Sequence, residues 1–140
     1  DQLSDGLKRM LDGTRAWHSA EATAKRNNLE HNDGQRIASV PPPRLHPVVR
    51  TNPETGRKAL FVNPHFVTHL EGMTEAESKP LLDCVYGSAT RPENVYRHHW
   101  WNGDLLIWDN RAAMHYAVRD YTPEDRRLMH RTTAAGVVVT

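Results

Sequence analysis

Residues 108–117, WDNRAAMHYA, decide both the fold and the chemistry predicted for this chain. They follow a short apolar run, 105–108, that lies behind the turn signal Asn102-Gly103-Asp104. A brief run bounded by glycine is typical of a buried strand rather than a helix, so we expect a core strand that ends near Asp109. His115 follows this strand and is the candidate metal ligand.

Two arginines on the next predicted strand extend the pattern. Residues 126–133 alternate in character, so Arg127 and Arg131 are expected to share one face. Their Cα atoms would stand roughly 13 Å apart, a separation that suits two different anionic groups. Residues 119–125 are rich in turn formers, so the two strands should return antiparallel, as a hairpin-like pair that brings His115 and Arg127 toward one site.

Three separated motifs resemble one known family. They are WDNRAAMHYAVRDY (108–121), RRLMHRTT (126–133) and LHPVVRTNPETGRKALFVN (45–63), and they occur in the order found in the C-terminal half of the taurine/alpha-ketoglutarate dioxygenase family. The resemblance extends from about residue 3 to residue 136. Members of this family are iron(II)- and 2-oxoglutarate-dependent oxygenases. The resemblance implies a mainly β fold with flanking helices, part of a double-stranded β-helix (jelly-roll) core.

The resemblance also implies the roles of individual residues. His115 corresponds to the later of two iron-binding histidines, and Arg127 to the arginine that binds the distal carboxylate of 2-oxoglutarate. Arg131 corresponds to a position that reaches the anionic group of the substrate or supports the cosubstrate end of the pocket. Trp108 and Asn110 are expected to support His115, as a wall and a bend beside it. No catalytic residue is predicted beyond the metal ligand.

The family's His-x-Asp metal pair lies upstream of the region that this sequence covers. Two local strings have a similar pattern, His31-Asn32-Asp33 and His69-Leu70-Glu71. The second is the better substitute because residues i and i+2 of a strand face the same way, although such a pair is more often merely solvated. The first lies in a loop-like stretch that controls ligand geometry poorly. We therefore expect an incomplete chain, the C-terminal portion of one dioxygenase domain, that is inactive by itself.

The activity that the resemblance implies is an oxidation. Two imidazoles and a carboxylate on one face of iron(II) leave three positions for bidentate 2-oxoglutarate and dioxygen. Family analogy suggests a small anionic organic substrate of the sulfonate, sulfate ester or aryloxyalkanoate type. Two alternatives stay open: a jelly-roll module that binds anions without redox chemistry, and an inactive fragment.

Composition predicts a soluble, cytoplasmic protein. The chain carries 18 Lys+Arg and 17 Asp+Glu, a net charge of +1, so nothing favours nucleic acid or a charged membrane as a partner. No apolar run approaches the roughly 20 residues that span a bilayer. The single cysteine, Cys84, is expected on a packed helix face and is consistent with a reducing cytoplasm. Small molecules and dioxygen are the expected partners, and homo-oligomerisation is left open.

Two helical segments and a loop are predicted in the first half of the chain. A helix is expected from residue 3 to about residue 25, interrupted at Gly13, with Ser4 or Asp5 as its cap. Residues 27–43 are expected to form a mobile or poorly ordered loop, with a lid role as the less favoured alternative.

A hairpin, a helix and a sheet block are predicted after this loop. The hairpin is expected at 48–62. Thr74 and Glu77 offer a capping box, but Pro80 conflicts with a helix already running from Thr74. Either the early residues form a separate turn, or Ser78 is the cap. The final sheet block is expected to contain the strands 95–101, 105–108, 114–118 and 128–134.

Overall fold

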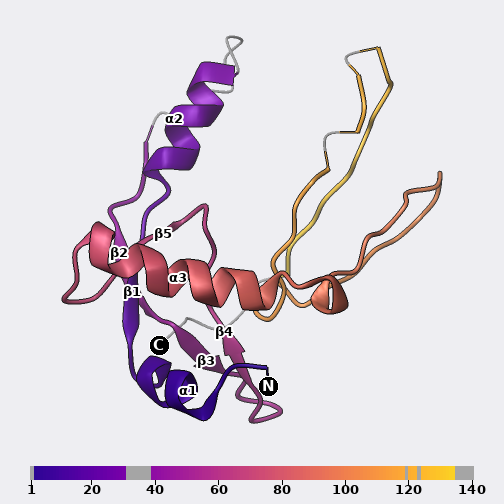
Figure 1. The fold of residues 1–140 in the computed structure, drawn as a ribbon. Coiled ribbons are helices and arrows are strands. Elements are labelled where there is room, and N and C mark those ends of the chain that lie inside the picture. The colour runs from indigo at the N-terminus through magenta and orange to yellow at the C-terminus, as the bar shows by residue number, and fades with distance from the viewer. Residues whose placement is uncertain (1, 31–38, 119, 123, 135–140) are drawn as a thin grey trace.

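The computed structural model describes residues 2–30, 39–118, 120–122 and 124–134. Figure 1 shows a body of short helices and strands, from which two long arms extend beyond the C-terminal end of helix α3. The first arm is residues 95–108 and the second arm is residues 113–134. The 3-10 helix η1 (Pro92–Asn94) leads into the first arm.

Three antiparallel strands form the main sheet of the body. β1 (Arg15–His18) is central and pairs with β2 (Arg44–Pro47) on one side and β5 (Val67–Leu70) on the other. Ala16 stands opposite His46 in β2 and Leu70 in β5. Because β1 is bonded along both edges, its backbone polar groups are satisfied within the sheet.

The predicted first helix is correct up to Gly13 and wrong beyond it. α1 (Asp5–Leu11) begins at Ser4, whose Oγ accepts a hydrogen bond from the Leu7 amide at 3.3 Å, as expected for a cap. Gly13 has φ 79°, a conformation that ends a helix, and the chain continues as strand β1. Ala16 is fully buried between its two partner strands. Strand pairing across the fold therefore overrides the helical spacing.

The next helix enters the stretch predicted to be a loop. α2 (Glu21–Glu30) passes through Asn27 and Asn28, so the prediction of a loop from residue 27 is wrong for its first turn. The Glu21–Lys25 ion pair, with 2.8 Å between Oε1 and Nζ, joins residues one turn apart. The predicted loop at 31–38 lies outside the described residues. Residues 39–43 are described without helix or strand, and their mobility stays a prediction.

The predicted hairpin is confirmed. β3 (Val49–Thr51) and β4 (Lys58–Leu60) pair antiparallel around the expected turn. Asn52 Oδ1 accepts a hydrogen bond from the Glu54 amide at 2.9 Å, and Gly56 has φ 68°. These are the residue types that such a turn requires.

α3 (Glu75–Ala89) is one continuous helix, so the alternative start at Ser78 is wrong. The predicted capping box is present, with Thr74 as the N-cap. Pro80 lies inside the helix and leaves one backbone hydrogen bond unmade. Ser78 is fully buried instead, and its Oγ accepts a hydrogen bond from the Leu70 amide at 2.9 Å. This bond ties the start of α3 to β5.

One hydrophobic core joins α1, the sheet strands and α3. Its buried residues are Leu11, Ala16, Val48, Val62, Leu70, Leu82 and Val85. Cys84 is exposed, so its predicted burial is wrong: Leu82 and Val85 mark the buried face of α3, and Cys84 points away from it. Within the described ranges, no helix is long and apolar enough to cross a membrane.

The four strands predicted after residue 94 are absent from the described residues, which form extended arms instead. Leu105 is 84 % exposed and Ile107 is 82 % exposed, although the short apolar run 105–108 predicted a buried strand. A strand forms only where a partner completes its backbone hydrogen bonds. The predicted turn is nevertheless present, since Gly103 has φ 92° and the Asp104 amide donates to the Trp101 carbonyl at 3.1 Å.

A half-buried histidine lies beside the core. The His18 ring stacks on Phe61, with 5.5 Å between centroids, and meets the edge of His46 at 5.0 Å. Its Nε2 is buried without a hydrogen-bond partner. Desolvation by burial, aided by the charge of His46, lowers the pKa of His18 from 6.5 to about 4.

This shift makes stability depend on pH. In the unfolded chain His18 takes up its proton near pH 6.5, whereas in the folded chain it does so near pH 4. Between these values the unfolded state binds more protons, so we expect stability to fall as the pH drops through this window and to be fully present above it. The urea midpoint followed by far-UV circular dichroism at pH 7.5 and pH 5 measures this loss. His18→Phe should reduce it, and the same change at the exposed His99 is the control; an undiminished loss in His18→Phe would contradict the assignment.

Candidate metal and cosubstrate site

His115 lies near the start of the second arm and packs against Trp108, the last residue of the first arm. Their ring centroids are 5.1 Å apart and the ring planes are inclined by 54°. His115 is exposed and Trp108 is 38 % exposed. The indole therefore stands beside the imidazole, where the sequence predicted a wall.

The link between the arms is a tight turn at residues 109–112. Asp109 Oδ1 accepts hydrogen bonds from Nε and the amide N of Arg111, both at 2.9 Å, and Oδ2 accepts from Nη2 at 3.0 Å. The Asp109 carbonyl accepts from the amides of Ala112 and Ala113, each at 3.1 Å. These bonds hold the pKa of Asp109 below its usual value, chiefly through the Arg111 side chain. Asn110 lies exposed within this turn.

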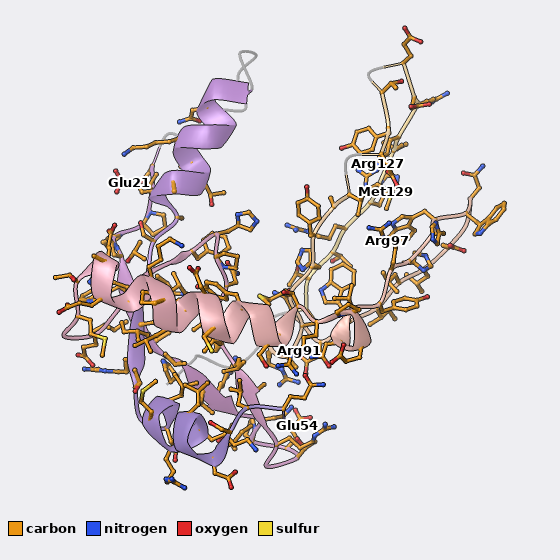
Figure 2. The ribbon with its side chains drawn as sticks, viewed as in Figure 1. Glu21, Glu54, Arg91, Arg97, Arg127 and Met129 are labelled. Carbon is orange, nitrogen blue, oxygen red and sulfur yellow. The ribbon has the colours of Figure 1, made fainter. Side chains whose placement is uncertain are left out.

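Arg127 lies on the returning limb of the second arm, where Figure 2 labels it close to Met129. Its guanidinium carbon is 5.0 Å from the centroid of the Tyr121 ring, a cation–π contact. The limb turns back where Thr122 N and Oγ1 donate to Asp125 Oδ2, at 2.6 and 2.9 Å. Arg131 is exposed farther along the limb.

The second arm runs outward and returns (Figure 1). By their positions in the chain, His115 belongs to its outgoing limb and Arg127 to its returning limb, although neither limb is the predicted strand. Each has its own aromatic neighbour, Trp108 for the imidazole and Tyr121 for the guanidinium. Neither side chain lines the hollow beside Asp109 and Arg111 or the hollow beside His18 and His46. The convergence of His115 and Arg127 on a single ligand stays a prediction.

Metal donors do not converge in the described part of the chain, where no group of three or more His, Cys, Asp or Glu side chains could hold an ion. The substitute pair, His69 in β5 and Glu71 just after it, has other partners. His69 stacks on Trp17 with 6.3 Å between centroids, and Glu71 accepts a hydrogen bond from Arg15 Nε at 2.8 Å. That bond lowers the pKa of Glu71. The other string, 31–33, lies outside the described residues.

One contact at the site was not predicted. The 109–112 turn packs on the β3–β4 hairpin around a hollow of about 20 Å³. The two stretches belong to two of the three motifs that define the resemblance, and each carries charged residues. The opposite charges of Arg50 in motif 45–63 and Asp109 in motif 108–121 were the sequence signal that could have predicted this contact.

The family model described as "Taurine catabolism dioxygenase TauD, TfdA family" matches residues 1–133. The chain belongs to this family. Among TauD/TfdA relatives, an alkylsulfatase of Acinetobacter baylyi is 37 % identical over 146 residues, which cover 100 % of this chain and 45 % of the relative. An alpha-ketoglutarate-dependent 2,4-dichlorophenoxyacetate dioxygenase of a Burkholderia species is 39 % identical over 137 residues, covering 97 % and 45 %.

Solved structures agree with the family. A putative alpha-ketoglutarate-dependent 2,4-D dioxygenase from Burkholderia xenovorans has 36 % identity and a TM-score of 0.64. AAD-2, solved in complex with Mn(II) and N-oxalylglycine, has 30 % identity and a TM-score of 0.66. Each likeness covers 80 % of this chain and 43 % of the other. The predicted family and the jelly-roll fold class are confirmed. The TauD/TfdA chain spans about half the length of the curated relatives it matches.

Proposed function

We propose that this chain is the C-terminal portion of an iron(II)- and 2-oxoglutarate-dependent dioxygenase that oxidises a small anionic organic substrate in the cytoplasm. The observation that carries the proposal is family membership over 1–133 together with relatives that are named for this activity. Other relatives are named for sulfonates, in Schizosaccharomyces pombe, and for sulfate esters, in Pseudomonas putida. These names support a substrate of the sulfonate, sulfate ester or aryloxyalkanoate type. The proposal includes no nucleic acid or membrane partner.

In the proposed enzyme His115 gives one imidazole to iron(II), and Arg127 binds the distal carboxylate of 2-oxoglutarate. Arg131 binds the anionic group of the substrate. A guanidinium suits these anions because its planar donors can pair with both oxygens of a carboxylate. Bound iron would couple the decarboxylation of 2-oxoglutarate to oxidation of the substrate by dioxygen.

The described residues alone do not fit the metal. They supply His115 without the further ligands that a site of three would need. The arms support an incomplete core, since many of their large apolar side chains are exposed, among them Tyr96, Trp101, Leu105, Ile107, Tyr116 and Leu128. Large exposed apolar patches mark interaction sites. We propose that the remaining part of the jelly roll covers it.

Anaerobic titration of the 140-residue chain with Fe(II) and 2-oxoglutarate tests the metal assignment. We expect no full-strength charge-transfer absorption, because one imidazole cannot hold iron(II) against water and buffer. His115→Ala, which removes the candidate ligand, is the matched control and should give the same baseline. A full-strength band from the 140-residue chain would mean that another set of residues binds the metal.

If this chain is part of a longer protein, that protein tests the function itself. If it carries an upstream His-x-Asp, it should give the charge-transfer band, lose it in His115→Ala, and release succinate from 2-oxoglutarate. The anion-binding alternative is supported by arginines in a region without a described metal group. Binding of 2-oxoglutarate by the longer protein without metal and without succinate would favour that alternative.

A further inference from the structure

The turn that joins the two arms sits on the β3–β4 hairpin. The hollow between them has a volume of about 20 Å³, room for roughly one water molecule and far too little for a cosubstrate. It is therefore a close contact between two elements rather than a ligand pocket. Its lining comes from both sides: Arg50, Asn52 and Ala59 of the hairpin, and Asp109, Arg111 and Ala112 of the turn.

Charges of opposite sign face each other across this contact. The pKa of Asp109 is lowered first by its hydrogen bonds from Arg111, and also by the positive charge of Arg50. The pKa of Arg111 is raised first by its hydrogen bond to Asp109, and also by the negative charge of Glu54 in the hairpin turn, labelled in Figure 2. Each charged residue of the turn therefore has an oppositely charged residue on the hairpin: Arg50 for Asp109, and Glu54 for Arg111.

Arg50 is held in place on its own side of the contact. Its guanidinium carbon lies 5.8 Å from the centroid of the Phe61 ring, just beyond the end of β4. Asp109 is held on the other side by its three hydrogen bonds from Arg111. The bonds within the turn would form in any orientation of the turn. The charges of the hairpin favour the orientation that is observed.

We propose that Arg50 and Asp109 are positioning residues that fix the 109–112 turn on the β3–β4 hairpin and thereby set the place of His115. The first arm ends and the second arm begins at this turn. Trp108 and His115 touch across it, so a change in its orientation moves both. The described parts of the arms contain no strand that could fix them in another way. The effect on catalysis rests on the proposed function, whereas the anchoring does not.

Spin labels at Thr55→Cys and Ala113→Cys, in a Cys84→Ser background, report the distance between hairpin and turn. We expect a narrow distance distribution that broadens in Arg50→Gln and in Asp109→Asn. The double variant should broaden it no further, because both changes remove one interaction. Arg57→Gln removes the same charge from the same hairpin outside the contact, and should leave the width unchanged. Screening by 1 M NaCl should also broaden the distribution.

If the distance distributions of Arg50→Gln and Arg57→Gln have equal widths, with unchanged circular dichroism, the proposed anchoring of the turn by Arg50 is wrong. In the longer enzyme, Arg50→Gln should weaken Fe(II) binding by roughly tenfold, as loss of a supporting contact behind a metal ligand does. The KM for 2-oxoglutarate should change much less. Broadening with an unchanged Fe(II) affinity would overturn the positioning role. An enzyme without iron-dependent activity would reject the proposed function but leave the spin-label result standing.

Discussion

Arg127→Leu is expected to raise the KM for 2-oxoglutarate by roughly 10- to 150-fold in the proposed dioxygenase. Hydrogen bonds to a charged group contribute about 1.5–3 kcal/mol each, and about 1.4 kcal/mol corresponds to a factor of ten. Leucine keeps the apolar part of the side chain but cannot donate to the carboxylate. Arg127 lies on an exposed arm outside the hydrophobic core, so folding should be unaffected. Steady-state kinetics with varied 2-oxoglutarate measure the change.

Two neighbours of Arg127 supply the controls. Arg126→Leu removes the same charge from the adjacent residue, which the alternation places on the opposite face, and should leave the KM for 2-oxoglutarate near its original value. Arg131→Leu should raise the KM for the anionic substrate more than the KM for 2-oxoglutarate. An unchanged KM for 2-oxoglutarate in Arg127→Leu would remove Arg127 from the site.

Leu70→Ala is expected to lower the free energy of unfolding by about 2–5 kcal/mol. The Leu70 side chain is 2 % exposed and lies in the core at the end of β5. Its truncation leaves a cavity between the sheet and α3, while its backbone hydrogen bond to Ser78 can remain. Urea unfolding followed by far-UV circular dichroism measures the loss, because this signal comes from the helices and strands of the body.

Leu105→Ala is the matched control for this substitution. The same change at a residue that is 84 % exposed should alter the free energy of unfolding by no more than about 0.5 kcal/mol. A loss at Leu105 as large as the loss at Leu70 would show that the first arm is packed in solution, against the exposure described here.

The sequence was sufficient where neighbouring residues determine the structure. Thr74 and Glu77 predicted the capping box of α3, although Pro80 argued against a helix that starts there. Asn52 and Gly56 predicted the hairpin turn, because caps and turns depend on a few adjacent groups. Helical spacing failed at β1 (Arg15–His18), since this strand forms by pairing with β2 and β5, which lie far along the chain. Pairing between distant segments leaves little trace in a local pattern.

The candidate site likewise has a part that the sequence predicted and a part that it did not. Motifs predicted the identities of His115 and Arg127, and the structure places them on two limbs of one arm, where their roles stay predictions. The burial predicted for Leu105 and Ile107 is wrong, because a short apolar run shows that these side chains are apolar and not what covers them. The contact of the 109–112 turn with the hairpin was equally hidden, since it depends on the folded path of the chain.

The division into body and arms also decides what an optical experiment on this protein would detect. Of the four tryptophans, Trp17 lies in β1, whereas Trp100, Trp101 and Trp108 lie on the first arm. Three of the four indoles would therefore respond to binding of a partner on the arms. Intrinsic fluorescence would report unfolding of the core only weakly, through Trp17. Tryptophan fluorescence would report binding on the arms, whereas far-UV circular dichroism would report unfolding of the body.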